Sequence, residues 1–231
     1  MMPVQTLQAL PVRQSAETWF LEYPLAGPLI RATHHGQRRV FEKGEHLYRQ
    51  GEVDSRFYFL LSGRVQVSVM SSEGNEFILE IMGRWAVCGE AAAFDKGPRF
   101  SAACALETVE AIEFDANNLT EAFRQDPEFA VALLRIASIK QRVVAVRVER
   151  LASQAPEGRL AELLRRLADL YGEEGPSGTR IKIRLTHEQI ASMTGTSRVT
   201  VTRTLKRWRK EEIIAVDGGS ITLRDLKRLV N

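Results

Sequence analysis

The chain has 231 residues, is 44% hydrophobic, carries a formal net charge of +3 and contains two cysteines. This composition suits a globular protein with one large or two small cores, and it excludes a disulfide-stapled scaffold. Residues 1–14 lack the basic start and apolar run of a signal peptide, and no apolar run approaches the ~18 residues of a membrane span. We therefore expect a cytoplasmic protein.

The charge is unevenly distributed along the chain. From residue 156 onward cations outnumber acids by about five, whereas acids are in slight excess before it. The asymmetry makes the C-terminal third the candidate nucleic-acid surface. The alternative interpretation is that these lysines and arginines only solvate helix faces.

The first part of the chain predicts β structure. Residues 1–35 are expected to form a short helical lead-in, and residues 36–117 contain short alternating runs broken by glycine. "GRVQVSVM" alternates cleanly, with Val65, Val67 and Val69 on one face, and "SSEGNE" predicts the hairpin turn that follows. This pattern indicates a double-sheet jelly roll, or β-roll.

Residues 118–154 change to a helical period, with no glycine and with Pro127 at an expected helix start. An apolar stripe at spacings of three and four residues is expected to form a dimer seam; its members are Phe129, Leu133, Ile136, Ile139, Val143 and Val146. The alternative is an amphipathic helix that packs on its own β-roll. We favour the seam, because the helix is longer than one small roll can cover.

Residues 155–231 predict a separate domain. "RLAELLRRLADLYG" reads as a helix, "GEEGPSGT" as a turn and "RIKIRL" as a basic strand. Thr186 and Gln189 form a capping-box pattern, Gly195 suits a helix end, and Thr196 or Ser197 can cap a second helix that runs through Lys210. "EIIAVDGGSITLRD" then predicts a two-stranded wing. The expected fold is α+β, with a jelly roll, a long dimerisation helix and a winged helix-turn-helix.

The second helix of this pair is the candidate DNA-reading element. Val201, Leu205 and Trp208 are expected to be buried, which leaves the opposite face for DNA. Arginine can bond guanine, valine can touch a thymine methyl, and hydroxyls suit phosphates. The candidate contact residues are Ser197, Arg198, Val199, Thr200, Thr202, Arg203 and Lys206.

With these residues the chain resembles the cAMP receptor protein/FNR (CRP/FNR) family of bacterial transcription regulators. The resemblance covers about residues 35–230 and rests on "LTHEQIASMTGTSRVTVTRTLKRWRKEEII" and "CGEAAAFDKGPRFSAACALET". It implies a homodimer through the long helix, a palindromic operator and contact with RNA polymerase. Arg198 and Arg203 match the two arginines of the family pattern, while its usual glutamate is Val199 here, so we expect a changed half-site.

The resemblance also implies an effector site. Gly89, Glu90 and Ser101 match residues that hold the ribose and the cyclic phosphate in cAMP-binding members. The arginine of that pattern is Phe100 here, and Arg99 stands one residue early. In a strand, a shift of one residue turns a side chain to the opposite face, so Arg99 is expected to miss the phosphate unless a bulge re-aims it.

The adenine-reading pair aligns with Val144 and Ala145, which offer no side-chain hydrogen bonds. We therefore expect an effector other than cAMP, or none. No metal, haem or iron–sulfur cluster is expected, since a cluster needs four cysteine ligands and the chain has only Cys88 and Cys104.

The chain lacks the sequence motifs of several common enzyme classes. It contains no P-loop, no nucleophile elbow and no metal-spaced His/Cys cluster, so we expect no enzyme. The runner-up is a cyclic-nucleotide-sensing module that acts through protein partners. The sequence leaves open the effector, the operator, the direction of regulation and any redox role of the two cysteines.

Overall fold

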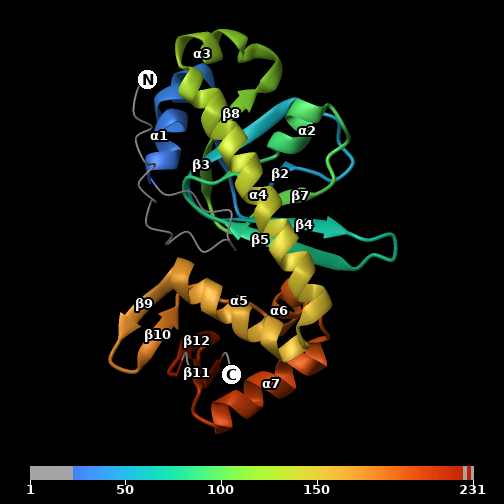
Figure 1. The fold of residues 1–231 in the computed structure, drawn as a ribbon, viewed down its shortest axis with the longest axis vertical. Helices are drawn as coiled ribbons and strands as arrows, with labels where there is room; N and C mark the ends of the chain where they lie inside the picture. Colours follow the sequence, from blue (N-terminus) through green and yellow to red (C-terminus); the bar gives the residue numbers. More distant parts are fainter. Residues whose placement is uncertain (1–22, 226–227, 230–231) are drawn as a thin grey trace, which may run out of the picture.

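The computed structural model describes residues 23–225 and 228–229. The lead-in predicted over residues 1–35 is helical where it is described, with α1 at Tyr23–Arg31 and a 3₁₀ turn at Ala32–His35, and its residues 1–22 lie outside the described part. Figure 1 shows a β-roll, one long helix beside it, and a second compact unit below.

Two antiparallel four-stranded sheets make the roll, which confirms the predicted jelly roll. In spatial order the first contains β1 (Gln37–Phe41), β8 (Val109–Asp115), β3 (Arg56–Ser62) and β6 (Val87–Cys88). The second contains β2 (His46–Tyr48), β7 (Ala102–Ala105), β4 (Val65–Met70) and β5 (Glu76–Met82). The short helix α2 (Glu90–Asp95) follows β6, and the predicted hairpin joins β4 to β5, with Gly74 at a φ of 82° in its turn.

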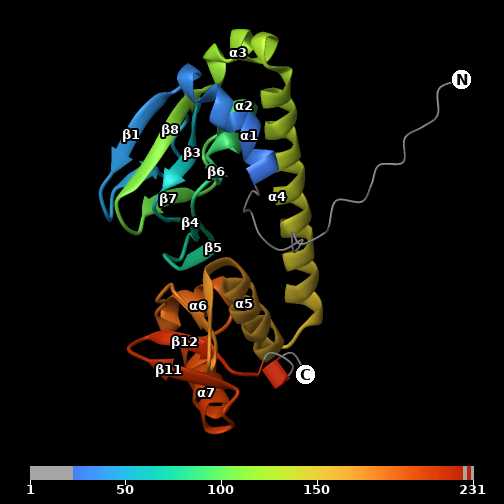
Figure 2. The same ribbon diagram turned by 90° about the vertical axis from the view of Figure 1, so that its left-hand side faces the viewer.

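The long helix is anchored to the roll by aromatic packing. After α3 (Thr120–Gln125), α4 runs over Pro127–Ser153 with Pro127 in its first turn, as predicted. Phe129 of α4 lies 5.3 Å from Phe114 of β8, which itself stacks on Phe57 at 5.2 Å, and all three rings are fully buried. Figure 2 shows α4 running along one side of the roll and on to the lower unit.

The lower unit has α5 (Pro156–Tyr171), α6 (His187–Thr194), α7 (Arg198–Lys210) and a four-stranded antiparallel sheet. Its strands are β11 (Ile214–Asp217), β12 (Ser220–Leu223), β10 (Gly178–Ile181) and β9 (Gly172–Gly175). The wing, β11 and β12, is confirmed. The expectation of a turn over "GEEGPSGT" is wrong in part, because residues 172–175 pair with β10 as a strand although they look like turn residues locally.

The hairpin β4–β5 joins the roll to the lower unit. The Ser192 hydroxyl of α6 donates to the Glu76 carbonyl at 2.6 Å and accepts from the Ile78 amide at 2.8 Å. The Tyr171 hydroxyl donates to the Ile81 carbonyl at 2.9 Å, and Ile81 belongs to the hydrophobic core of the lower unit. The two units are therefore held by packing and by hydrogen bonds, in addition to the covalent link through α4.

A buried ion cluster lies at the same junction. Glu80 of β5 is 1% exposed, and its carboxylate lies 2.5 Å from a guanidinium nitrogen of Arg147 of α4 and 3.7 Å from one of Arg166 of α5. A carboxylate of the roll thus contacts both the long helix and the lower unit at the point where the three meet. No helix among the described residues is both long and apolar enough to cross a bilayer.

Candidate nucleic-acid interface and effector pocket

The turn between α6 and α7 is fixed by local capping. Thr186 and Gln189 make both hydrogen bonds of a capping box, and Gly195 ends α6 at a φ of 59°. Ser197 rather than Thr196 caps α7, with its hydroxyl accepting from the Thr200 amide at 3.1 Å. The predicted helix-turn-helix is therefore present, and α7 projects from one end of the molecule (Figure 1).

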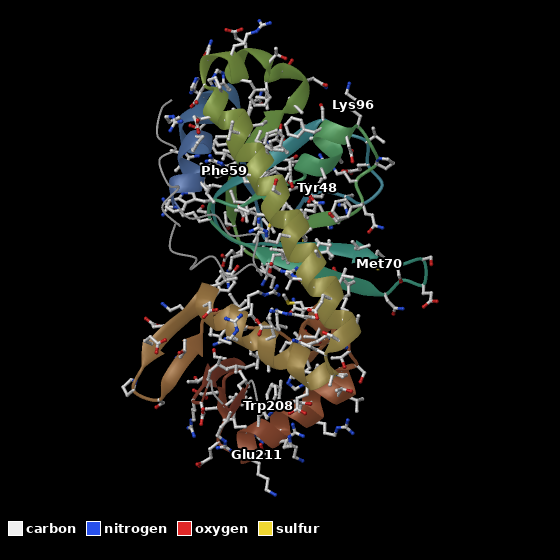
Figure 3. The ribbon with its side chains drawn as sticks, in the orientation of Figure 1. Tyr48, Phe59, Met70, Lys96, Trp208 and Glu211 are labelled. Atoms are coloured by element: carbon white, nitrogen blue, oxygen red, sulfur yellow. The ribbon has the colours of Figure 1, made fainter. Side chains whose placement is uncertain are left out.

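One face of α7 is buried in the core of the lower unit. Val201, Leu205 and Trp208 are at most 4% exposed, as predicted. The Trp208 indole donates to the Glu157 carboxylate of α5 at 3.1 Å, and Arg207 pairs with the same carboxylate. Figure 3 shows Trp208 on the inner side of α7 and Glu211 just beyond the helix end. Packing and this shared carboxylate thus fix the rotation of α7.

The opposite face of α7 is exposed and contains no acid. Ser197, Arg198, Val199, Thr202, Arg203 and Lys206 are exposed, and Thr200 is half-buried. Val199 is 74% exposed, so its methyl groups are available on this face. Near the end of the helix a surface hollow is lined by Arg203, Lys206, Arg207, Arg209 and Lys210. The arrangement offers exposed cations that can neutralise phosphates, beside two exposed arginines whose guanidinium groups can bond base edges.

Thr202 has a different local role from the other candidates. Its hydroxyl donates to the Arg198 carbonyl at 2.9 Å and lies 2.8 Å from Nδ1 of His187 on α6. Thr202 therefore links the two helices of the motif in this structure. Sequence reasoning missed His187, because the pairing only exists once the turn brings the two helices together.

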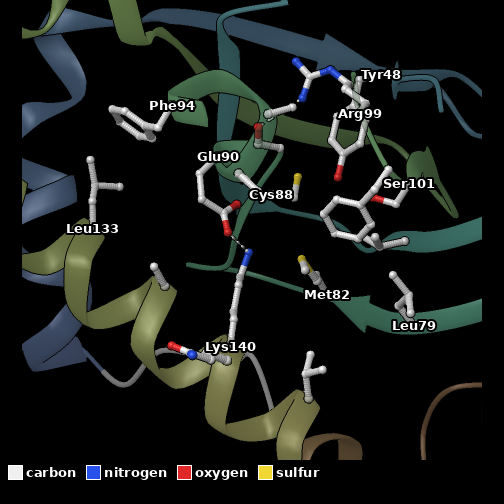
Figure 4. A pocket seen from close by; sticks show the side chains of 18 of the residues that line it. Tyr48, Leu79, Met82, Cys88, Glu90, Phe94, Arg99, Ser101, Leu133 and Lys140 are labelled. Atoms are coloured by element: carbon white, nitrogen blue, oxygen red, sulfur yellow. Dashed lines mark hydrogen bonds and ion pairs between the residues drawn. The ribbon is translucent and has the colours of Figure 1, made fainter. Parts of the chain in front are cut away.

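The second candidate site is a cavity of about 640 Å³ between the roll, α2 and α4. Most of its walls are apolar, and they include Val67, Leu79, Met82, Phe94, Leu133 and Val144. Figure 4 shows side chains of the roll and of α4 facing each other across it. Its volume lies within the usual range of small-molecule pockets, roughly 300–1,000 Å³.

An ion pair crosses this cavity. The Lys140 ammonium of α4 lies 2.7 Å from the Glu90 carboxylate and donates to the Val87 carbonyl at 2.7 Å (Figure 4). Lys140 was not among the predicted site residues. Its spacing could have identified it: Lys140 stands four residues after Ile136 and three before Val143, on the stripe that faces the roll. A cation in that position needs a partner of opposite charge.

The orientation inferred for Arg99 and Phe100 is wrong. Arg99 is 2% exposed and faces inward, whereas Phe100 is 57% exposed at the rim of the cavity. The two residues lie in a loop between α2 and β7, so strand alternation does not apply to them. Both line the cavity.

The Arg99 guanidinium is nevertheless engaged by the protein. It donates to the Gly89 carbonyl at 3.1 Å and to the Arg56 carbonyl at 2.5 Å, and it lies 3.9 Å from the Asp54 carboxylate. Its carbon centre lies 4.3 Å from the Tyr48 ring centroid, a cation–π distance. Figure 4 places Arg99 beside Tyr48, away from the pair formed by Glu90 and Lys140.

The remaining polar groups of the cavity stay uncharged. Burial raises the pKa of the Tyr48 hydroxyl well above its usual value and raises the pKa of the Cys88 thiol to about 12. Ser101, which sequence reasoning proposed for the effector, is buried and lines the cavity with Gly89 and Glu90. Val144 also lines it, whereas Ala145 is exposed and lies outside its lining.

The predicted dimer seam is wrong in its residues. Phe129, Ile136 and Val143 are at most 1% exposed and Leu133 is 7% exposed, because this stripe packs on the chain's own roll. Ile139 and Val146 are half-buried on the same side. The alternative interpretation, an amphipathic helix covering its own roll, is therefore correct for the five of these residues that pack in the roll clusters, all but Val146.

A second apolar stripe of α4 faces outward. Leu134 is 68% exposed, Val148 60%, and Val144 and Leu151 47% each. With Ala137 and Gln141 these residues follow spacings of three and four, the a and d positions of a heptad pattern. Sequence reasoning missed this stripe because both faces of α4 are apolar and the more regular one faces inward.

Comparison with known proteins covers both units. The model of the cyclic nucleotide-binding domain matches residues 38–126, and the model of the Crp-like helix-turn-helix domain matches residues 158–231. A CRP-like cAMP-activated global transcriptional regulator of Mycobacterium tuberculosis is 32% identical over 189 residues, which cover 82% of this chain and 84% of that protein. The global nitrogen regulator of Nostoc is 29% identical and covers 80% of this chain and 83% of that protein.

Solved structures show the same architecture. A mutant of CooA from Carboxydothermus hydrogenoformans aligns with a TM-score of 0.74 at 23% identity, over 86% of this chain and 88% of that one. A CRP/FNR-family transcriptional regulator from Thermus thermophilus aligns with a TM-score of 0.67 at 27% identity, over 84% of this chain and 96% of that one.

Proposed function

The chain belongs to the cAMP receptor protein/FNR family of DNA-binding transcription regulators, and we propose that it acts as a homodimer on a palindromic operator under the control of a small effector other than cAMP. The observation that carries the DNA-binding part is the exposed face of α7, which combines Arg198, Val199 and Arg203 with further cations and no acid. The rotation of α7 about its axis is fixed by its buried stripe and by the hydrogen bond from Trp208 to Glu157.

Direct reading of the operator falls to the N-terminal half of α7. Arg198 and Arg203 can each make two hydrogen bonds to a guanine, and Val199 can touch a thymine methyl. Lys206 and Ser197 suit backbone phosphates, as do Thr200 and the cationic end of the helix. Because Val199 has no acceptor for a cytosine amine, the half-site should lack the base preference that a carboxylate there would give.

The homodimer is proposed to form through the outward stripe of α4. Leu134, Val144, Val148 and Leu151 leave an apolar strip exposed, and pairing with a second copy would remove it from water on both chains. Gln141 in the middle of the strip is a polar a-type position, which favours one register and a two-stranded assembly. A two-fold dimer presents two copies of α7, which matches a palindromic operator.

The cavity is proposed to hold the effector. It adjoins the dimer strip, since Leu134, Ala137, Gln141 and Val144 belong to both. A bound molecule would therefore touch the α4 surface that meets the partner, and it could shift the balance between arrangements of the two DNA-binding units.

Cyclic AMP fits this cavity poorly. Its phosphate needs a cation, but the Arg99 guanidinium is already bonded to two carbonyls and stacked on Tyr48. The helix residues that align with the adenine-reading pair, Val144 and Ala145, offer no side-chain hydrogen bonds, although Gln141 of the same helix lines the cavity. The name of the mycobacterial relative says that it is cAMP-activated, and the same sensitivity is not proposed here.

The family also suggests that the bound dimer contacts RNA polymerase, and action on chromosomal DNA would take place in the cytoplasm. The relatives named above are regulators rather than enzymes. We propose neither a metal nor a cofactor for the chain.

The test is selection of a duplex from random DNA by the purified protein, followed by fluorescence anisotropy of that duplex in a salt series with and without cAMP. Tight binding that cAMP leaves unchanged, with an affinity that falls by roughly a thousandfold or more between about 50 and 200 mM salt, is the expected result. Absence of any enriched sequence would contradict the DNA-binding role. Binding that requires cAMP would contradict the proposed effector class.

A further inference from the structure

The charges inside the cavity balance one another. Glu90 is paired with Lys140 at 2.7 Å, and Arg99 is held by Asp54 and by two backbone carbonyls. Tyr48 and Cys88 remain protonated near neutral pH because burial raises both pKa values. An uncharged occupant leaves every one of these contacts in place.

A charged occupant would break them. An anion would have to compete with Glu90 for Lys140, or with two carbonyls for the Arg99 guanidinium, whose Nε has no partner but is itself buried. Drawing either cation away would leave a buried carboxylate or buried carbonyl oxygens without that partner. A cation would face the same problem with Glu90. The internal pairing therefore discriminates by charge against ions of either sign.

The aromatic side chains in the cavity walls favour an occupant that contains a ring. Tyr48, Phe94, Phe100 and Phe123 line the cavity, and Phe94 and Phe100 are 44% and 57% exposed although both are large and apolar. An aromatic or alicyclic occupant would cover these side chains and pack against their faces or edges. Ser101 and Gln141 supply the few polar groups that would orient it.

From these observations we propose that the effector is an uncharged, largely apolar ring compound with one or two hydrogen-bonding groups. This inference rests on the proposed role of the cavity as the effector pocket. It assigns the ligand class from the pairing of Glu90 with Lys140, the engagement of Arg99 and the aromatic walls.

The test compares two fluorescent probes that share a ring system and differ in charge. Phenylnaphthylamine is neutral, and anilinonaphthalenesulfonate carries a sulfonate. The neutral probe is expected to bind the full-length protein at one site per chain, and about tenfold or more tighter than the sulfonate. An excess of cAMP is expected to leave the neutral probe bound.

Charge variants locate the probe. Glu90→Gln removes the carboxylate that balances the charge of Lys140, so it should raise the affinity for the sulfonate by about tenfold while the neutral probe binds as before. Lys140→Gln removes a positive charge instead of a negative one, and it should lower the affinity for the sulfonate below that of the wild type. Glu73→Gln makes the same charge change at the exposed tip of the hairpin β4–β5 and should alter neither affinity.

The outcomes separate the two proposals. Wild-type protein that binds the sulfonate or cAMP as tightly as the neutral probe, or that fails to bind the neutral probe, overturns the ligand class; this comparison stands even where a variant fails to fold. DNA affinity is measured in parallel on the selected duplex. A neutral probe that binds at one site per chain and leaves that affinity unchanged would support the ligand class and contradict the effector role in the proposed function.

Discussion

Replacing Glu80 with glutamine should destabilise the protein at the junction of the two units. The carboxylate is 1% exposed and lies 2.5 Å from Arg147 and 3.7 Å from Arg166, and its other oxygen accepts from the Ile81 amide at 3.1 Å. Glutamine keeps the shape and one acceptor but removes the charge. Two largely buried guanidinium groups then share the site without that counter-charge.

The magnitude follows from the cost of breaking a buried ion pair on one side, about 3–5 kcal/mol. Because glutamine retains hydrogen bonding, the lower end, about 3 kcal/mol, is expected. For a chain of this size each kcal/mol corresponds to roughly 2–4 °C in Tm, so the expected decrease is about 6–12 °C. The loss should also loosen the docking of the lower unit, because Glu80 contacts α4 and α5 together.

The assay is thermal unfolding followed by circular dichroism, with Glu73→Gln as the matched control. Glu73 lies on the same hairpin and is exposed, so its substitution should leave Tm within the error of the wild type. Limited proteolysis between α4 and α5 gives an independent readout of docking. A Tm for Glu80→Gln equal to that of Glu73→Gln would refute the reasoning that this carboxylate holds the junction.

Three further predictions concern the interface, the dimer and the cysteines. Arg203→Ala should weaken binding to the selected duplex by about 1–3 kcal/mol, roughly 5- to 150-fold, measured by anisotropy. Leu134→Asp should convert a dimer to a monomer in sedimentation equilibrium. Each leucine buried at the interface contributes about 1.5–3 kcal/mol, and a dimer contains two of them. The control, Arg142→Asp on the flank of the same helix, should leave the dimer intact. In the native state Cys88, with its pKa near 12, should resist Ellman's reagent at about pH 8, while the half-buried Cys104 reacts.

Each of these predictions has a control and a contrary outcome. Arg38→Ala removes an exposed arginine of the roll that pairs with Glu110, and it should leave DNA affinity unchanged. If Arg38→Ala and Arg203→Ala lowered DNA affinity equally, binding would depend on the overall positive charge and not on α7. A Leu134→Asp protein that remains dimeric would place the interface elsewhere. Reaction of two thiols in the folded protein would mean that the cavity opens far more readily than its packing indicates.

Local signals in the sequence were sufficient for the helix-turn-helix and its wing. Caps, turn glycines and an apolar stripe act over a few residues, so the sequence alone places Thr186 and Gly195 and limits the second cap to Thr196 or Ser197, of which the structure has Ser197. The helix-turn-helix agrees between pattern and structure because the same residues make the local and the tertiary contacts. In β4 the agreement is partial: Val65 and Val67 enter the core as the alternation predicts, but Gln66 and Ser68 are also buried and Val69 is half-buried.

Long-range contacts explain where the sequence misled. Both faces of α4 are apolar, and periodicity alone cannot say which one packs on the roll, so the pattern places Phe129 and Val143 in a dimer seam although they pack on the roll. Strand alternation predicts the wrong orientation for Arg99, because Arg99 lies in a loop. The pairing of Glu90 with Lys140 joins residues fifty positions apart in the chain, and no spacing rule connects them.

Two copies of α7 are proposed to read one duplex, and hydroxyl-radical footprinting of the selected duplex tests this. The expected result is two protected half-sites related by two-fold symmetry, with centres about one helical turn or a whole number of turns apart, each turn roughly 34–36 Å. The Arg203→Ala protein should lose both halves together. A single protected half-site, or protection that is not lost when Arg203 is removed, would contradict the proposal that a dimer reads the operator through α7.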